Sequence, residues 1–186
     1  MKRMRGDQLT GGSRDVNPQY MIITTTQSGA DTTTSSSLNV PIDRLREGQG
    51  KVGVIEILKV FWELSDLPET ASAAEIIEEV VGRLTTFNGG TTNIAFQEPR
   101  LIASVQSRRI GAFTAAGTYS TIQSAYPVIQ DLTDGAGHGI LVATDSIFLQ
   151  VQSTATSQSN VGICRIMYRF KNVSLAEYIG IVQSQQ

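Results

Sequence analysis

One histidine, His138, and one cysteine, Cys164, are the residues with the most versatile chemistry in this chain of 186 residues. His138 lies in the glycine-rich segment 134–139, DGAGHG, which we expect to be a hairpin turn between two strands. A Ser-His-Asp triad needs two further groups held against the imidazole, and a cupin-type metal centre needs several imidazoles. A histidine at a loop tip is far more often a solvated surface residue. We therefore predict no catalytic residue, no cofactor and no enzymatic activity.

Three carboxylates, Glu75, Glu78 and Glu79, form the densest acidic cluster. Carboxylates at helical spacing can bind a divalent cation together, but they also form the ordinary solvated face of an amphipathic helix. The segment 134–137 lacks the lysine and the following Ser or Thr of a phosphate-binding loop. A single cysteine allows neither an intrachain disulfide nor a cysteine-based zinc site. The sequence therefore predicts no metal site.

Basic residues gather at the N-terminus. With one acid among them, the four cations give the first fourteen residues a net charge of +3, which leaves −5 for the rest of a chain whose total is −2. Residues 1–17 carry almost no apolar side chain, so they cannot bury enough surface to offset their ordering entropy. We expect a mobile basic arm at 1–17 and a single domain at 18–186. Two readings of this arm stay open: a segment held near phosphates by its charge, and a solvated terminus without function.

Four more arginines lie in segments that we expect to be strands. In 163–170 the alternation of side chains puts Arg165 and Arg169 on one face. Together with the arm they are the candidate nucleic-acid-binding residues: Lys2, Arg3, Arg5, Arg14, Arg108, Arg109, Arg165 and Arg169.

Short segments rich in β-branched and aromatic residues recur between clusters of Gly, Ser, Asn and Asp, which is typical of a sandwich or barrel. The segment 52–64 is the strongest, and we expect a central strand whose residues Val52, Val54, Leu58, Val60, Trp62 and Leu64 share one face. Eight segments fit strands, at 19–26, 36–42, 52–64, 100–113, 126–132, 139–151, 161–170 and 175–182. Eight antiparallel strands in one domain favour an all-β jelly roll, a β-sandwich with a short helix in a loop.

That helix is expected at 73–84. Ile76, Ile77, Val80, Val81 and Leu84 make one helical stripe, and Asn-Gly-Gly at 88–90 ends the segment. A pair of strands is the competing interpretation, because Ile and Val are also good strand formers.

Charged residues make up 17% of the chain, below the roughly 25% that is usual, and Ser, Thr, Gln and Gly take their place. A weakly charged surface tolerates burial against partners, so the composition leans toward assembly. The longest apolar run, 52–64, is interrupted by charges and is too short to span a bilayer. The N-terminus has no apolar core of the signal-peptide type, so we expect synthesis in a cytosol and no membrane partner.

Two segments resemble the capsid proteins of small circular Rep-encoding single-stranded DNA viruses, in particular those of circovirus-like members. They are the C-terminal stretch 163–186, ICRIMYRFKNVSLAEYIGIVQSQQ, and the strand segment 54–63, VIEILKVFWE. The close likeness covers about a fifth of the chain. It departs from the usual family pattern at the start, where four basic residues stand in place of a long arginine-rich arm.

The resemblance implies a coat protein that assembles with copies of itself into a small icosahedral shell, T=1 with 60 copies, around a circular single-stranded DNA genome. It implies a place in the virion and synthesis in the host cytoplasm. Import into the host nucleus by way of Lys2 to Arg5 stays open, because the short arm departs from the family pattern. No residue identifies a host receptor. The alternative function is a binding module on the same fold, a lectin-like or cytokine-like trimer, which would not need the basic arm.

Overall fold

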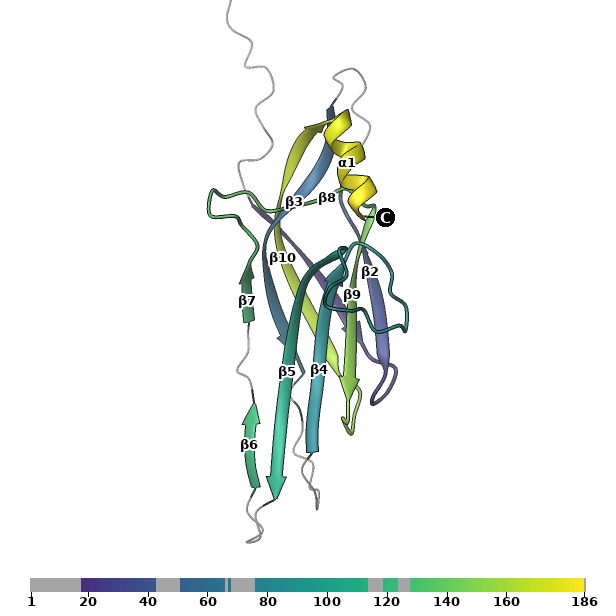
Figure 1. Ribbon diagram of the computed structural model, residues 1–186, viewed down its shortest axis with the longest axis vertical. Coiled ribbons are helices and arrows are strands. Elements are labelled where there is room, and N and C mark those ends of the chain that lie inside the picture. The colour runs from purple at the N-terminus through teal and green to yellow at the C-terminus, as the bar shows by residue number, and fades with distance from the viewer. Residues whose placement is uncertain are drawn as a thin grey trace, which may run out of the picture.

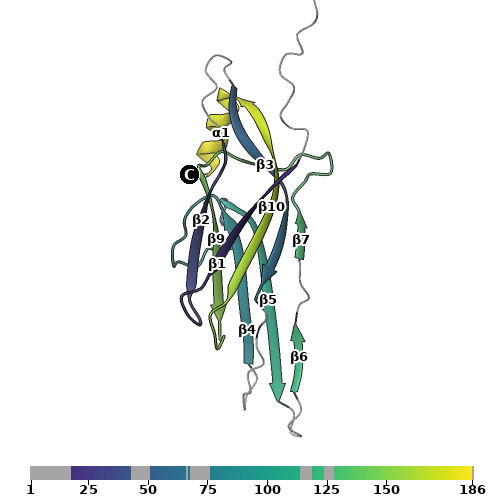
Figure 2. The same cartoon turned by 180° about the vertical axis from the view of Figure 1, so that it is seen from behind.

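The computed structural model describes residues 18–42, 51–65, 67, 76–113, 119–123 and 128–185. Two five-stranded antiparallel sheets pack face to face (Figures 1 and 2). Sheet A has the order β1-β10-β3-β7, with β8 also paired to β3, and contains β1 (Gln19–Thr26), β10 (Val161–Ser174), β3 (Lys51–Leu64), β7 (Val128–Asp131) and β8 (Ile140–Val142). Sheet B has the order β2-β9-β4-β5-β6 and contains β2 (Thr33–Asn39), β9 (Ser146–Thr154), β4 (Ile76–Thr85), β5 (Leu101–Phe113) and β6 (Tyr119–Gln123).

The core lies between the two sheets, where the inward-facing side chains of both sheets meet. Trp62 is at its centre, and its indole nitrogen donates a hydrogen bond of 2.9 Å to Gln130. A side chain at Gly82 would begin 3.0 Å from the Trp62 ring, so the glycine makes room for the indole between the sheets. Each fully buried Ile or Leu contributes roughly 1.5–3 kcal/mol to this core. Its largest aliphatic members are Ile55, Ile57, Leu84, Ile147, Leu149 and Ile166.

The prediction that 52–64 is a central strand is confirmed, since β3 pairs with β10 on one side and with β7 and β8 on the other. The prediction of a single continuous face is wrong at Leu58. The register passes from Met167 opposite Lys59 to Tyr168 opposite Ile57, so Leu58 forms a bulge. Beyond the bulge the side chains change sides, so Ile57 joins the core while residues 54 and 56 face outward.

The helix expected at 73–84 is wrong, and the competing strand interpretation holds for its described part. Residues 76–85 form β4, which pairs antiparallel with β5 and with β9. Its inward residues Glu78, Val80, Gly82 and Leu84 follow a period of two. Residues 73–75 lie outside the described residues. A run of adjacent Ile and Val pairs fits both periods, and tertiary pairing decides for the strand.

The strand expected at 175–182 is also wrong, because α1 (Leu175–Gln185) occupies this segment. The Ser174 hydroxyl accepts a hydrogen bond of 3.2 Å from the Glu177 backbone amide, as an N-cap does. Ser174 and Glu177 have the spacing of a capping box. Tyr178, Ile181 and Val182 pack on the outer side of sheet A against Val54, Ala143 and Val173. The helix therefore covers one end of that sheet's outer face (Figure 1).

The predicted fold class, an antiparallel jelly-roll sandwich with one short helix, is confirmed. The strand count differs because one expected strand is divided, two strands, β4 and β6, were not expected, and the strand expected at 175–182 is a helix. The segment 139–151 contains β8 and most of β9, separated by residues 143–145, and β6 adds to the edge of sheet B. β7 and β8 together take one strand position beside β3. No helix among the described residues has the length and apolar character needed to cross a membrane.

Candidate functional site

The arm cations Lys2, Arg3, Arg5 and Arg14 lie outside the described residues, so both the arm and the domain boundary stay predictions. The described chain enters the sandwich through β1, where Gln19 is paired opposite Tyr168 of β10. The start of β1 therefore lies beside β10, in the half of sheet A that also carries α1 (Figure 2).

Arg165 lies on the outer face of sheet A and is exposed. Its guanidinium carbon is 4.1 Å from the centre of the Tyr20 ring and 5.8 Å from that of Phe61. Both contacts are within the range of cation–π attraction. The strand register places Ile22, Arg165, Phe61 and Ile129 in one straight row across β1, β10, β3 and β7.

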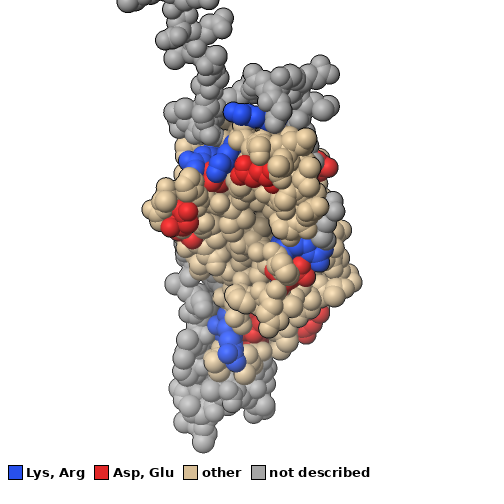
Figure 3. Space-filling model, turned by 45° about the horizontal axis from the view of Figure 1, so that its top comes forward, with Lys and Arg blue, Asp and Glu red and all other residues tan. Residues whose placement is uncertain are grey.

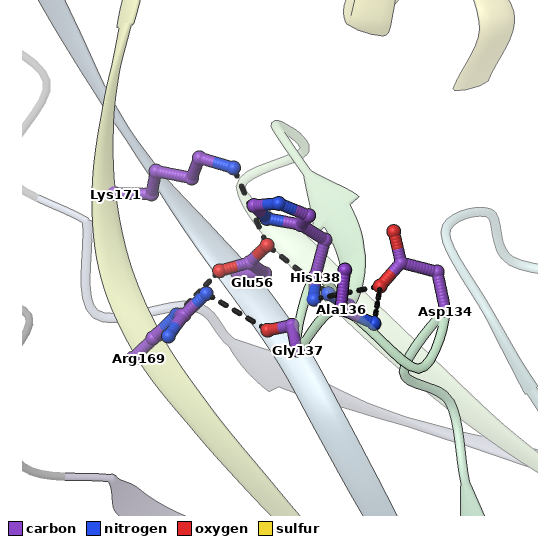
Figure 4. A network of polar contacts seen from close by, with 8 residues as sticks. Glu56, Asp134, Ala136, Gly137, His138, Arg169 and Lys171 are labelled. Atoms are coloured by element: carbon purple, nitrogen blue, oxygen red, sulfur yellow. Dashed lines mark hydrogen bonds and ion pairs between the residues drawn. The ribbon is translucent and has the colours of Figure 1, made fainter.

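Arg169 points to the same face as Arg165, as predicted, but its guanidinium is engaged within the protein (Figure 4). Its Nε donates a hydrogen bond of 2.5 Å to Glu56, and Nη2 donates one of 3.0 Å to the carbonyl of Gly137. Lys171 Nζ lies 3.3 Å from the other oxygen of Glu56. That oxygen also accepts a hydrogen bond of 3.0 Å from the backbone amide of Gly139.

Glu56 is fully buried and joins three segments of the chain. Burial alone would raise the pKa of this carboxyl. The hydrogen bond from Arg169, the one from the Gly139 amide and the positive charge of Lys171 outweigh burial and hold the pKa below its usual value. The cluster thus ties β3, β10 and the 132–139 loop together as a structural unit.

The DGAGHG loop joins β7 to β8, which both run antiparallel to β3, so it is not the hairpin turn that we expected. The Asp134 carboxylate accepts hydrogen bonds from the backbone amides of Ala136, at 2.9 Å, and His138, at 3.0 Å. The hydrogen bond from the His138 amide, together with that from Ala136, lowers the pKa of Asp134. Gly135 and Gly137 have positive φ angles of 83° and 89°, which favour glycine. His138 is exposed on this loop, where the turn was predicted.

Arg108 and Arg109 point to opposite faces of sheet B, as neighbours on a strand must. Arg108 is exposed and sits opposite Glu79 of β4. Arg109 is buried between the sheets, where it forms an ion pair with buried Glu78 and donates a hydrogen bond of 3.3 Å to the carbonyl of Leu67. The solvated acidic face expected for Glu78 is therefore wrong, because this carboxylate neutralises an internal arginine.

The four candidate arginines of the body, Arg108, Arg109, Arg165 and Arg169, do not form one basic surface. Arg165 and Arg169 are on the outer side of sheet A, and Arg108 is on the outer side of sheet B. On the face in Figure 3, most basic side chains lie beside acidic ones, and uncharged surface separates these groups. Within the described residues no group of three or more His, Cys, Asp or Glu side chains could hold a metal ion.

Comparison with protein-family models gives no match, and neither does sequence comparison with curated proteins. Solved structures do match. The apo VP1 of New Jersey polyomavirus superposes with a TM-score of 0.51 at 8% identity, over 85% of this chain and 100% of that chain. VP1 of Trichodysplasia spinulosa-associated polyomavirus, in complex with GM1 oligosaccharide, gives 0.50 at 10% identity, over 88% and 97% of the two chains.

The chain shares the jelly-roll fold of these two viral capsid proteins. At such low identity the likeness concerns the fold alone. The likeness to capsid proteins of circular single-stranded DNA viruses stays a resemblance in sequence.

Sequence reasoning missed Glu56 and Lys171 as members of one cluster. The signal was an isolated carboxylate in the apolar run 52–64, which cannot be buried without a cation. The pairing of β3 with β10, which supplies the two cations, could not be read from either segment alone. The apolar row across sheet A was hidden for the same reason.

Proposed function

We propose that this protein is a viral coat subunit that assembles with copies of itself into a closed icosahedral shell around nucleic acid. The observation that carries the proposal is the capsid jelly roll, which extends over 85% of the chain and the whole of a compared VP1 chain. The low charge content and the basic N-terminal segment support it, because a coat subunit needs surfaces for its neighbours and a contact for its cargo.

The finer features of the proposal rest on the C-terminal sequence resemblance and on charge. They are a T=1 shell of 60 copies, a circular single-stranded DNA genome and location in the virion. The cargo would be bound by the arm and by the exposed body cation Arg108, whereas Arg165 lies among the apolar side chains on the outer face of sheet A. Arg109 and Arg169 would contribute by fixing β5 and β10, since their guanidinium groups are engaged with Glu78 and Glu56.

Negative-stain microscopy of the purified recombinant protein tests the shell, and nuclease digestion of its cargo tests the genome. We expect uniform shell-shaped particles. The nucleic acid inside them should resist nuclease until the shell is opened. The released cargo should then be degraded by DNase I and resist both RNase and an exonuclease that needs a free end. For the cargo test, the particles are made in the presence of a replicating DNA circle. RNA or linear DNA in those particles would contradict the proposed circular DNA cargo. A protein that stays a trimer would favour the binding module.

A further inference from the structure

The outer face of sheet A carries an apolar row where an antiparallel sheet normally meets water with polar side chains. Ile22 and Ile129 are each 58% exposed at the two ends of this row, and Tyr20 is 47% exposed beside it. Phe61, Ile163 and Met167 are partly buried between them. A continuous apolar surface on four strands marks a site of contact with another macromolecule.

The charges on this face indicate what kind of partner it takes. Lys59 pairs with Asp131 at 2.9 Å, and Glu63 offsets Arg165, so the face is close to neutral. A nucleic acid needs a net positive surface, which this nearly neutral face does not provide. A weakly charged, largely apolar protein surface fits better. Under the proposed function, on which this inference rests, the protein surface available in quantity is that of a second copy.

The position of Arg165 decides how that copy docks. Within the described part of the chain its guanidinium contacts the rings of Tyr20 and Phe61 and no carboxylate. If two copies packed this face on itself about a two-fold axis that passes near Arg165, the two guanidinium groups would meet in the same apolar interface, where like charges repel strongly. A different surface of the second copy can instead present acceptors to the guanidinium.

We propose that the outer face of sheet A, built on Ile22, Phe61, Ile129 and Arg165, is the main subunit contact and docks a different surface of a second copy. Such a head-to-tail contact closes into rings when its rotation permits, which suits the vertices of a shell. The contact buries the apolar row and supplies hydrogen-bond acceptors to Arg165.

The test uses the full chain with Ile22→Glu and Ile129→Glu, and Phe96→Glu as the matched control. Phe96 is 77% exposed on the β4–β5 connection, away from sheet A. We expect each isoleucine variant to raise the protein concentration needed for assembly at least about tenfold, and the control to leave it unchanged. Circular dichroism and melting temperature establish that all three variants fold.

Arg165→Leu separates the two docking modes. Head-to-tail docking predicts weaker assembly, because the acceptors of the second copy lose their donor. Two-fold packing of the face on itself predicts stronger association, because a repulsion is removed, and that result would overturn the proposal.

The remaining outcomes are also decisive. If the wild-type protein forms no assembly, the proposed function itself fails. If the wild type assembles and the folded isoleucine variants assemble equally well, only this inference fails. If those variants assemble normally but lose binding to an oligothymidylate probe, the face is a nucleic-acid platform and the inference is overturned.

Discussion

At the scale of single residues, Glu56 is the buried carboxylate of sheet A on which two basic side chains and a backbone amide converge. We expect Glu56→Gln to lower the free energy of unfolding by about 3 kcal/mol or more, because it leaves Arg169 and Lys171 without their buried counter-charge. Chemical denaturation at neutral pH measures the change. Glu98→Gln is the control, since Glu98 pairs with Arg100 near the surface and should matter much less. Equal effects of the two variants would contradict the role of Glu56.

The same carboxylate predicts a dependence on pH. Its pKa in the folded protein is below the ordinary value of 4.5, so the unfolded chain takes up the proton first. The stabilisation is therefore complete above about pH 4.5 and is lost as the pH falls through the lower pKa of the folded state. The difference in unfolding free energy between the wild type and Glu56→Gln should shrink as the pH is lowered below that value. A constant difference from pH 7 to pH 3 would contradict this.

At the scale of elements, the DGAGHG loop depends on close approach of its last residue to β3. A Cβ atom at Gly139 would lie 2.0 Å from the backbone oxygen of Ile57, so Gly139→Ala forces the loop away from the strand. We expect a loss of about 1–3 kcal/mol in thermal or chemical unfolding. Gly180→Ala makes the same change in α1, where nothing lies within 4 Å, and should be neutral or slightly stabilising. If both substitutions change the free energy of unfolding equally, the close contact of Gly139 with Ile57 does not contribute to stability.

The elements also separate what the sequence predicts from what it does not. The alternation in 161–170 identifies β10, and the apolar run at 52–64 identifies β3. Both patterns are readable because both strands bury apolar side chains in the core. The segment 73–84 is ambiguous, since its Ile and Val pairs satisfy both periods and only pairing with β5 and β9 resolves them. For α1 the capping box from Ser174 to Glu177 was a usable signal that the apolar pattern obscured. The bulge at Leu58 and the clusters at Glu56 and Glu78 depend on register, which one strand does not specify.

At the scale of the whole molecule, we propose that the body forms the contacts between copies and that the N-terminal arm binds the cargo. Deleting residues 1–14 removes none of the described strands, so the remainder should fold and still assemble. Binding to a single-stranded oligonucleotide should weaken, and its logarithmic dependence on salt should become shallower by up to about 3, since four cations are lost.

Replacing Lys2, Arg3, Arg5 and Arg14 with glutamine keeps the length of the arm and should reproduce both effects. Fluorescence anisotropy over a range of salt concentrations measures them. If both variants bind the oligonucleotide as the wild type does, the arm does not bind the cargo.

The mass of the purified particle is the most direct test of self-assembly into a closed shell. Light scattering coupled to size-exclusion chromatography, at physiological salt and high protein concentration, measures it without any assumption about shape. Sixty copies of the 20.1 kDa chain give about 1.2 MDa, so we expect a uniform species whose protein component has that mass, to which enclosed nucleic acid adds. A single species at the mass of one chain, or of three, would contradict it.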